Sequence, residues 1–374
     1  MRSVYDVTAL EEQILLNPDL ELKWSHLVRQ YIKEEAFPGC VIYVSKEGRS
    51  LFHRPFGNYT YDPGSPSVVL DTMYDLASVT KITTTVPMVM KLWEEKKLSL
   101  DMKVIDFFPD FKDGEKSNIT FQNLITHMSG LPSWVAFYKE CSSVDEVIKA
   151  ICATPLKYPT GSKTEYSDLN MILMGEIVHK IYGAPLDVAV HREIHKPLGM
   201  KDTTYRPGIE LRVRITPTEN DPWRGRLLQG EVHDENAYAM GGVSGHAGLF
   251  STTADLARYG QCILNGGILD GVRIFKNETI EYFAQRPSSL IPGPYALGWW
   301  RNPSGLGWDK TLFSPGTIGH TGYTGTSIWM DRKRQTQVII LSNRVHPSRR
   351  HIKIGEFRGK FENLVISSLF PSDQ

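Results

Sequence analysis

Ser78 and Lys81 are residues whose types and spacing could perform nucleophilic catalysis. If this segment opens a helix, a separation of three residues places both side chains on one face, a single turn apart. A serine hydroxyl attacks poorly until a neighbouring group accepts its proton, and a desolvated lysine amine can accept it. The helix N-terminus would also favour an oxyanion that forms beside the serine. A capping serine followed by a solvated lysine has the same spacing, so the prediction depends on partners elsewhere in the chain.

Two later segments supply candidate partners. Tyr166 lies at the entrance of a predicted helix, with Asp168 two residues after it. A tyrosine phenolate beside an ammonium group can act as a general base, because an opposite charge lowers the tyrosine pKa. Residues 319–323 read Gly-His-Thr-Gly-Tyr and belong to a predicted strand. Glycine there lets the backbone approach a substrate closely, and a backbone N–H at this point could donate to an oxyanion.

In this order, the three segments resemble the signature of the serine β-lactamase and penicillin-binding-protein superfamily. They are most similar to its class C branch, which has D,D-carboxypeptidase, esterase and muramyl-peptide amidase relatives. That branch carries Tyr-x-Asn as its second element, which residues 166–168 resemble. The resemblance covers roughly residues 20–370. Its other supporting segments are residues 124–131, 197–200, 248–252 and 297–299.

The resemblance implies a role for each matching residue. Ser78 would be the acylated nucleophile and Lys81 its proton partner, while Tyr166 would act as general base and then as acid to the leaving group. The backbone N–H groups of Ser78 and Tyr323 would form the oxyanion hole, with Thr321 and Gly322 beside the substrate. Loss of one such donor typically costs about 10²–10³ in rate. The sequence leaves open whether Lys81 or Tyr166 is the base in acylation.

Two positions depart from the family pattern. His320 stands where many members have a lysine that helps hold a substrate carboxylate and the tyrosine. Because a histidine is only partly charged near neutral pH, we predict inefficient β-lactam hydrolysis. Asp168 stands where asparagine is commoner. A carboxylate beside Lys81 could keep the lysine charged and shift the role of base toward Tyr166.

Four further residues are candidate substrate contacts. His233 and His246 lie in polar segments that resemble a subgroup associated with muramyl-peptide turnover, including N-acetylmuramyl-L-alanine amidases. They could equally serve only to satisfy loop backbone. Arg344 could contact a substrate carboxylate or be an ordinary surface arginine. Trp299 could form a cleft wall or belong to the core.

The composition excludes several classes of protein. The 374 residues contain 42 Lys+Arg and 42 Asp+Glu, so no basic field favours nucleic acid or an acidic membrane. The N-terminal segment lacks the apolar stretch of a secretory signal, and no window is apolar enough to span a membrane. The four cysteines are scattered, so we expect reduced thiols and a cytoplasmic protein.

The order of predicted elements indicates an α/β fold with a discontinuous domain. A helix and a hairpin near the N-terminus and strands and a helix near the C-terminus would form one domain, residues 1–75 and 295–374, with an antiparallel sheet flanked by the terminal helices. Residues 76–294 would form a mostly α-helical domain, with the active site at the interface. Predicted helices cover residues 21–37, 80–98, 120–127, 144–153, 168–182, 185–195, 254–264 and 351–369, and predicted strands cover 40–44, 51–56, 326–330 and 337–342.

We therefore predict a β-lactamase-related serine hydrolase that acts through an acyl-enzyme on amide, peptide or ester bonds. Substrates would be small molecules or peptides, such as cell-wall-derived muramyl or D-amino peptides, or small esters. The alternatives are a carboxylesterase with weak or no β-lactamase activity, and a non-catalytic ligand-binding or sensor relative. We expect no cofactor and no metal, since His191 and His195, four residues apart, lack a zincin pattern and favour a solvated helix face. The oligomeric state is left open.

Overall fold

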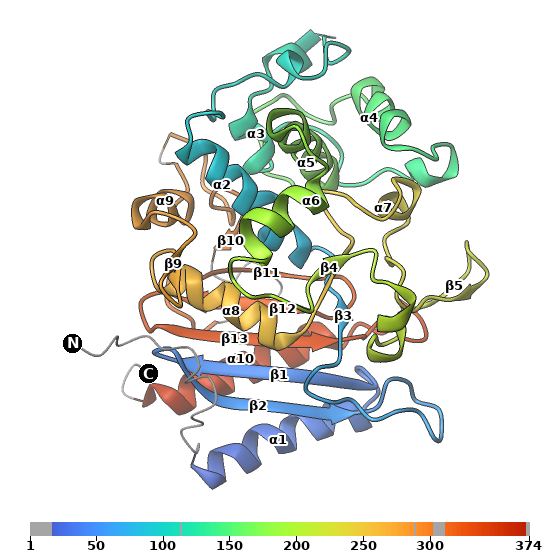
Figure 1. The fold of residues 1–374 in the computed structure, drawn as a ribbon, viewed down its shortest axis with the longest axis vertical. Coiled ribbons are helices and arrows are strands. Elements are labelled where there is room, and N and C mark those ends of the chain that lie inside the picture. Colours follow the sequence, from blue (N-terminus) through green and yellow to red (C-terminus); the bar gives the residue numbers. More distant parts are fainter. Residues whose placement is uncertain (1–16, 113, 288, 302–310, 372–374) are drawn as a thin grey trace.

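A computed structural model describes residues 17–112, 114–287, 289–301 and 311–371 of this chain. The N-terminal residues on which the prediction of no secretory signal rests lie outside these ranges. Both ends of the described chain meet in one antiparallel sheet of six strands (Figure 1). In spatial order, the strands are β10 (Trp300–Arg301), β11 (Ile318–Thr321), β12 (Ser327–Asp331), β13 (Thr336–Ser342), β1 (Gly39–Lys46) and β2 (Arg49–Gly57).

Both faces of the sheet are covered by helices, as the contacts of the β1 side chains show. Ile42 and Val44 pack into the cluster that contains the terminal helices α1 (Pro18–Lys33) and α10 (Ile354–Leu369). Val41 and Tyr43 point the other way, into the larger core that includes α8 (Thr253–Leu264). This alternation is the two-residue period of a strand, here apolar on both faces because both faces are buried. The predicted α/β fold, with terminal helices flanking the sheet, is confirmed.

The middle of the chain is mostly helical and lies above the sheet in Figure 1. Its central helix, α5, is buried on nearly every side, because its apolar residues are not confined to one stripe. It starts and ends at the predicted residues, and Gly183 directly after it has a φ of 69°, the left-handed conformation that terminates many helices. Besides α8, the α-helices described in this region are α2 (Val86–Glu94), α3 (Phe121–Ile125), α4 (Val144–Ala153), α5 (Asp168–Tyr182), α6 (Leu186–Val190), α7 (Glu235–Ala239) and α9 (Asn277–Phe283).

The helix predicted over residues 80–98 is divided in two. Lys81–Thr85 form a π-helical turn, and α2 follows with Pro87 in its first turn. Proline lacks the N–H that would bond the carbonyl of residue 83, four positions earlier. The Thr83 carbonyl instead lies 3.1 Å from Nε2 of His195, which is buried. The predicted solvated face is therefore wrong for His195, which satisfies a backbone group that the proline leaves free.

Short strands hold the connections between these helices. One small sheet has the order β3 (Tyr74–Asp75), β7 (Leu249–Ser251) and β4 (Thr204–Tyr205), and it fixes the chain just before Ser78. Two hairpins, β5 (Asn220–Asp221) with β6 (Arg226–Leu227) and β8 (Ile268–Leu269) with β9 (Val272–Arg273), stand at the periphery. The four cysteines are unpaired, as predicted. Among the helices described, none has the length and apolar character that a membrane span requires.

Candidate active site

The turn that carries Ser78 is held in an unusual backbone conformation. Ala77, immediately before it, has a φ of 46°, which an L-residue with a side chain adopts at a cost of about 1–2 kcal/mol. The Ala77 N–H donates to Oδ1 of buried Asp75 at 2.8 Å, and the other Asp75 oxygen accepts the N–H of His233 at 2.7 Å. One carboxylate thus ties the Ser78 turn to the His233 loop. Strain of this kind is often found where a structure must present a reactive group.

Ser78 Oγ lies within hydrogen-bonding distance of both predicted partners. Lys81 Nζ is 2.8 Å from it and the Tyr166 hydroxyl is 2.7 Å from it. Lys81 is fully buried, and its Nζ also contacts Asp168 Oδ1 at 2.7 Å and the carbonyl of His246 at 2.9 Å. An ammonium group has three donors, and each of them has an acceptor here. The structure therefore brings the first two sequence segments together around one serine oxygen.

Burial shifts the pKa values of the two groups that flank Ser78. It lowers the pKa of Lys81, an effect that the Asp168 carboxylate opposes. It raises the pKa of Tyr166 well above 10, and Asp168 raises that pKa further. The expectation that a neighbouring ammonium lowers the tyrosine pKa is therefore wrong. The main reason is the burial of the phenol, to which the Asp168 carboxylate adds.

His127 supports Tyr166 from behind. It belongs to segment 124–131, and its Nδ1 accepts the N–H of Ser167 at 3.1 Å. Its ring centroid lies 5.0 Å from that of Tyr166. Complete burial lowers the pKa of His127 well below 6.5, so the ring stays neutral and can accept this bond. The segment recognised in the sequence thus fixes the backbone that presents the phenol.

The turn after β11 brings Tyr323 beside the Ser78 turn. Thr324 Oγ1 donates to the Asp75 carbonyl at 2.7 Å, and Thr326 Oγ1 donates to the Leu76 carbonyl at 2.8 Å. A Cβ on Gly322 would stand 2.3 Å from the same Leu76 oxygen, so only glycine fits. Across the described ranges, no backbone hydrogen bond uses the amide of Ser78 or of Tyr323. These two N–H groups are thus available as oxyanion donors.

His320 does not reach the pocket at Ser78. It is buried behind Tyr166, with ring centroids 5.8 Å apart, and its Nδ1 lies 2.6 Å from the Thr321 carbonyl. Burial lowers the pKa of His320 to about 3, so the ring is neutral near pH 7 rather than partly charged, as the sequence had suggested. Thr321 is the half-buried last residue of β11.

Two of the four candidate substrate contacts have other roles. Trp299 is completely buried in the large core, and it is the adjacent Trp300 whose ring stacks 6.3 Å from that of Tyr166. Arg344 is buried, so the surface alternative is wrong for it. Its guanidinium donates to the Tyr323 carbonyl at 2.6 Å and lies 4.2 Å from the centroid of the Tyr323 ring. Arg344 therefore holds the turn that carries a candidate oxyanion donor.

The other two candidates, His233 and His246, line a cavity of about 400 Å³ that opens at Ser78. His246 Nε2 lies 2.8 Å from Asp234 Oδ1, and its Nδ1 lies 2.7 Å from Ser244 Oγ. His233 Nε2 lies 2.9 Å from Glu219 Oε2. The cavity is lined by Ala77, Ser78, Ser133, Trp134, Tyr166, Asp168, His233, Asp234, Glu235, His246, Ala247, Tyr323 and Arg349.

The carboxylates around these histidines are held ionised. Burial by itself would raise the pKa of Glu219, but hydrogen bonds from His233 and Arg349 lower it to about 2. Burial would likewise raise the pKa of Asp234, but the His246 imidazole, an N–H donor and Lys81 hold it well below its usual range. Arg349 contacts Glu219 at 2.7 Å and Glu235 at 2.8 Å. This network is fully paired.

Asp168, Asp234 and His246 offer potential metal-ligand atoms within 4.8 Å of one another. The contacts already described occupy them, since Asp168 pairs with Lys81 and Asp234 pairs with His246. The Lys81 ammonium beside them also repels a cation. We therefore interpret the group as a hydrogen-bonded network around Lys81.

The sequence did not indicate several residues that build this site. Asp75 precedes the Ser78 motif by three positions and looks like an ordinary strand residue. Glu219 and Arg349 are 130 positions apart and belong to no recognised segment, so nothing in the sequence links them. Trp134 lies three residues after segment 124–131, which carries His127, and this position near a recognised segment was the one available signal.

Comparison with known proteins places the chain among hydrolases. Residues 24–359 match the family described as Beta-lactamase. An N-acetylmuramyl-L-alanine amidase from Bacillus subtilis (strain 168) is 36% identical, over 83% of this chain and 78% of the relative. A protein from Escherichia coli (strain K12), provisionally named a D-alanyl-D-alanine carboxypeptidase, is 33% identical over 83% of this chain and 79% of its own.

A solved structure has the same fold at lower identity. It is EstCE1, described as a hydrolase with promiscuous acyltransferase activity, which superposes with a TM-score of 0.74 over 93% of this chain and 98% of its own. Its 19% identity supports the fold alone. The match over residues 24–359 and the two relatives above 30% identity establish the relationship independently. This chain belongs to the beta-lactamase family and is a serine hydrolase.

Proposed function

We propose that the protein hydrolyses amide or ester bonds through an acyl-enzyme on Ser78. The observation that carries this proposal is the contact of both Lys81 Nζ and the Tyr166 hydroxyl with one serine oxygen. The site would lie between the domain of residues 1–75 and 295–374 and the helical domain of residues 76–294. This arrangement lets the turn after β11 face the serine.

In acylation, Ser78 Oγ would attack the carbonyl carbon while Lys81, in its neutral form, takes the hydroxyl proton. The lowered pKa of Lys81 supports this assignment of the base, and the raised pKa of Tyr166 argues against a phenolate in the resting enzyme. The N–H groups of Ser78 and Tyr323 would bind the oxyanion. Tyr166 would then give its proton to the leaving amine or alkoxide as the carbonyl–leaving-group bond breaks.

Deacylation would return Ser78, Lys81 and Tyr166 to their starting protonation states. Water would attack the acyl carbonyl and give one proton to the Tyr166 phenolate. As the ester bond to Ser78 breaks, Lys81 would return its proton to the serine oxygen. The cycle needs no group beyond the residues around Ser78.

For the substrate, we propose a muramyl or D-amino peptide derived from cell wall, with small esters as further substrates. The named amidase relative supports the first class. The neutral, buried His320 supports slow turnover of β-lactams, because it offers no charge for their carboxylate. A carboxylesterase is the second candidate, and a reducing, cytoplasmic location stays a prediction.

The hydrolase proposal is tested with a fluorophosphonate probe and mass spectrometry. We expect one adduct on Ser78 and none in Ser78→Ala, together with loss of p-nitrophenyl acetate hydrolysis. An unmodified Ser78, or equal turnover by the variant, would favour the non-catalytic alternative. A panel of N-acetylmuramyl-L-alanine, a D-Ala-D-Ala peptide, p-nitrophenyl esters and nitrocefin then separates the substrate classes.

A further inference from the structure

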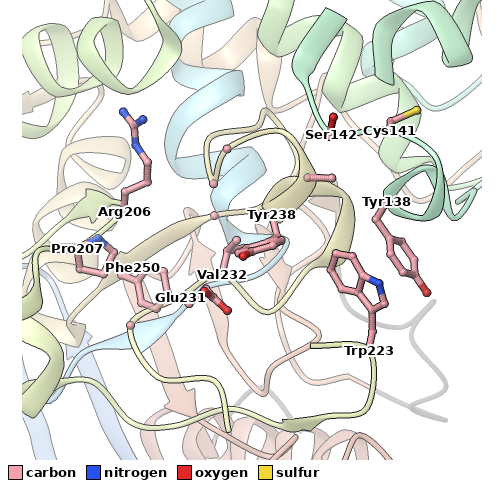
Figure 2. A pocket seen from close by; sticks show the side chains of 15 residues that line it. Tyr138, Cys141, Ser142, Arg206, Pro207, Trp223, Glu231, Val232, Tyr238 and Phe250 are labelled. Carbon is pink, nitrogen blue, oxygen red and sulfur yellow. The ribbon is translucent and has the colours of Figure 1, made fainter. Parts of the chain in front are cut away.

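Figure 2 shows a second cavity, of about 630 Å³. Aromatic side chains form much of its wall, namely Tyr138, Trp223, Tyr238 and Phe250. In Figure 2, Tyr138 and Trp223 lie close together, and Tyr238 stands nearer the middle of the group. The proposed acyl-enzyme chemistry uses none of these residues.

Residues that are neighbours in the sequence line the two cavities. Val232 and Gly248 line the second cavity, whereas their neighbours His233 and Ala247 line the cavity at Ser78. Tyr138 belongs to the second cavity, whereas Trp134 belongs to the cavity that contains Ser78. A group bound in the second cavity would therefore lie beside a bond held at the serine.

A row of aromatic rings connects the cavities, and we name it the aromatic track: Trp134, Tyr138, Trp223 and Tyr238. Ring centroids along it are 6.2 Å apart for Trp134 and Tyr138, 4.5 Å for Tyr138 and Trp223, and 5.8 Å for Trp223 and Tyr238. Trp134 is 43% exposed, Trp223 42% and Tyr238 36%. Large aromatic side chains that are grouped and left open to solvent are typical of a binding surface.

The charged groups of the second cavity already have partners. Glu231 pairs with Arg224 and Arg226, and Arg206 pairs with Asp187. A charged occupant would have to displace one of these pairs, so the cavity favours a neutral one. The hydroxyls of Tyr138 and Ser142 and the ends of the paired charges provide polar contacts at the rim.

The Arg224 guanidinium lies over one face of the Trp223 ring, at 5.6 Å, and over one face of the Tyr238 ring, at 4.7 Å. The exposed parts of these rings, with a polar rim, match the chemistry of a pyranose ring. One face of such a ring presents C–H groups that pack on an aromatic face, and its edge presents hydroxyls that form hydrogen bonds. An acyl chain has no hydroxyl edge, so it would leave the polar rim without partners. We propose that the aromatic track binds a sugar ring of the substrate while the bond to be cleaved reaches Ser78, an inference that rests on the proposed hydrolase function.

The test compares two amides that differ only in the sugar: N-acetylmuramyl-L-alanine and N-lactyl-L-alanine. The readout is the ratio of their kcat/KM values. In the wild-type enzyme, we expect the ratio to favour the sugar-bearing amide by at least about tenfold, and in Trp223→Ala we expect it to fall toward one. Tyr282→Ala is the matched control, because Tyr282 is an exposed aromatic residue that stacks on Trp93 outside the track.

Three results would overturn the proposal. They are a wild-type ratio near one, an unchanged ratio in Trp223→Ala, and an equal fall in Tyr282→Ala. A preference for p-nitrophenyl octanoate over the acetate that disappears in Trp223→Ala, with no sugar preference, would assign the track to an acyl chain instead.

A binding measurement separates this proposal from the hydrolase proposal. Ser78→Ala is titrated with N-acetylmuramic acid while tryptophan fluorescence is followed, and Trp223→Ala in the same background is the comparison. We expect saturation in the first protein and at least about tenfold weaker binding in the second. Failure of Ser78 to form an adduct would defeat the hydrolase proposal alone, whereas absence of saturation here would defeat the sugar site.

Discussion

Two buried polar networks lie near Ser78. In one of them the charged forms of the side chains are disfavoured, and in the other they are favoured. Around Lys81 and Tyr166, burial outweighs the partners, so the lysine pKa falls and the tyrosine pKa rises. Around Glu219, the partners outweigh burial, so its pKa falls to about 2. The difference lies in the partners, because Glu219 accepts from both Arg349 and His233. Tyr166 faces Asp168, which opposes its ionisation.

The two networks differ in function: one is suited to proton transfer and the other to holding the structure in place. A group whose buried environment disfavours its charged form is ready to exchange a proton, whereas a fully paired ion is fixed in one state. The network of Lys81 and Tyr166 has the first property and the network of Glu219 and Arg349 has the second. The two networks are linked through Asp75, whose carboxylate accepts the N–H of Ala77, beside Ser78, and the N–H of His233.

The largest expected effect is loss of the proton-transfer groups. Lys81→Met and Tyr166→Phe should each lower kcat for p-nitrophenyl acetate by about 10²–10⁴, the usual contribution of general acid–base catalysis. Ligand binding should persist in Tyr166→Phe, because only a hydroxyl is removed. Steady-state kinetics measure the fall in kcat, and thermal melts on the same preparations show that each variant is folded. A folded Tyr166→Phe variant with nearly full activity would refute the role given to the phenol.

For Asp168→Asn we expect a smaller effect, which is a change in the pH dependence of kcat/KM. The Asp168 carboxylate raises the pKa of Lys81, so its removal should lower that pKa and increase the neutral amine at a given pH. The alkaline rise of kcat/KM for an ester should therefore move to lower pH. A kcat/KM that falls rather than rises with pH through this pKa would show that Lys81 acts in its charged form.

In the paired network, the effect should be on stability. Glu219→Gln leaves Arg349 and His233 with weaker partners, and we expect a loss of about 1–3 kcal/mol in the free energy of unfolding. Turnover of p-nitrophenyl acetate per folded molecule should stay within about threefold of wild type. Denaturant unfolding measures the first quantity. Glu34→Gln, at an exposed pair with Lys353, is the control and should cause no measurable change.

The smallest effect concerns acid stability. Burial lowers the pKa of His195 to about 4, below the 6.5 of an exposed histidine. As pH falls below 6.5, protons bind the unfolded chain first, so stability declines until about pH 4. The melting temperature should drop by about 1–2 °C per pH unit from this residue. In His195→Gln the decline should be shallower, and an identical slope in both proteins would contradict the assignment.

Prediction from the sequence was strongest where local patterns suffice. The bounds of α4 and α5 were predicted to the residue, because the apolar spacing, the Ser143 cap of α4 and the Gly183 that follows α5 are local features. The helix over 80–98 was less well predicted, since the π-helical turn depends on Pro87 together with distant His195. Trp299 and His320 are buried where packing places them, which spacing alone does not reveal.

The sequence by itself determined the fold, the family and the grouping of Ser78, Lys81 and Tyr166, because these depend on residue type, order and periodicity. The tertiary structure decided which of these groups is ready to accept a proton, because a pKa depends on burial and on charges brought from distant segments. It also decided where a sugar ring could lie, since the aromatic track is assembled from three separate parts of the chain.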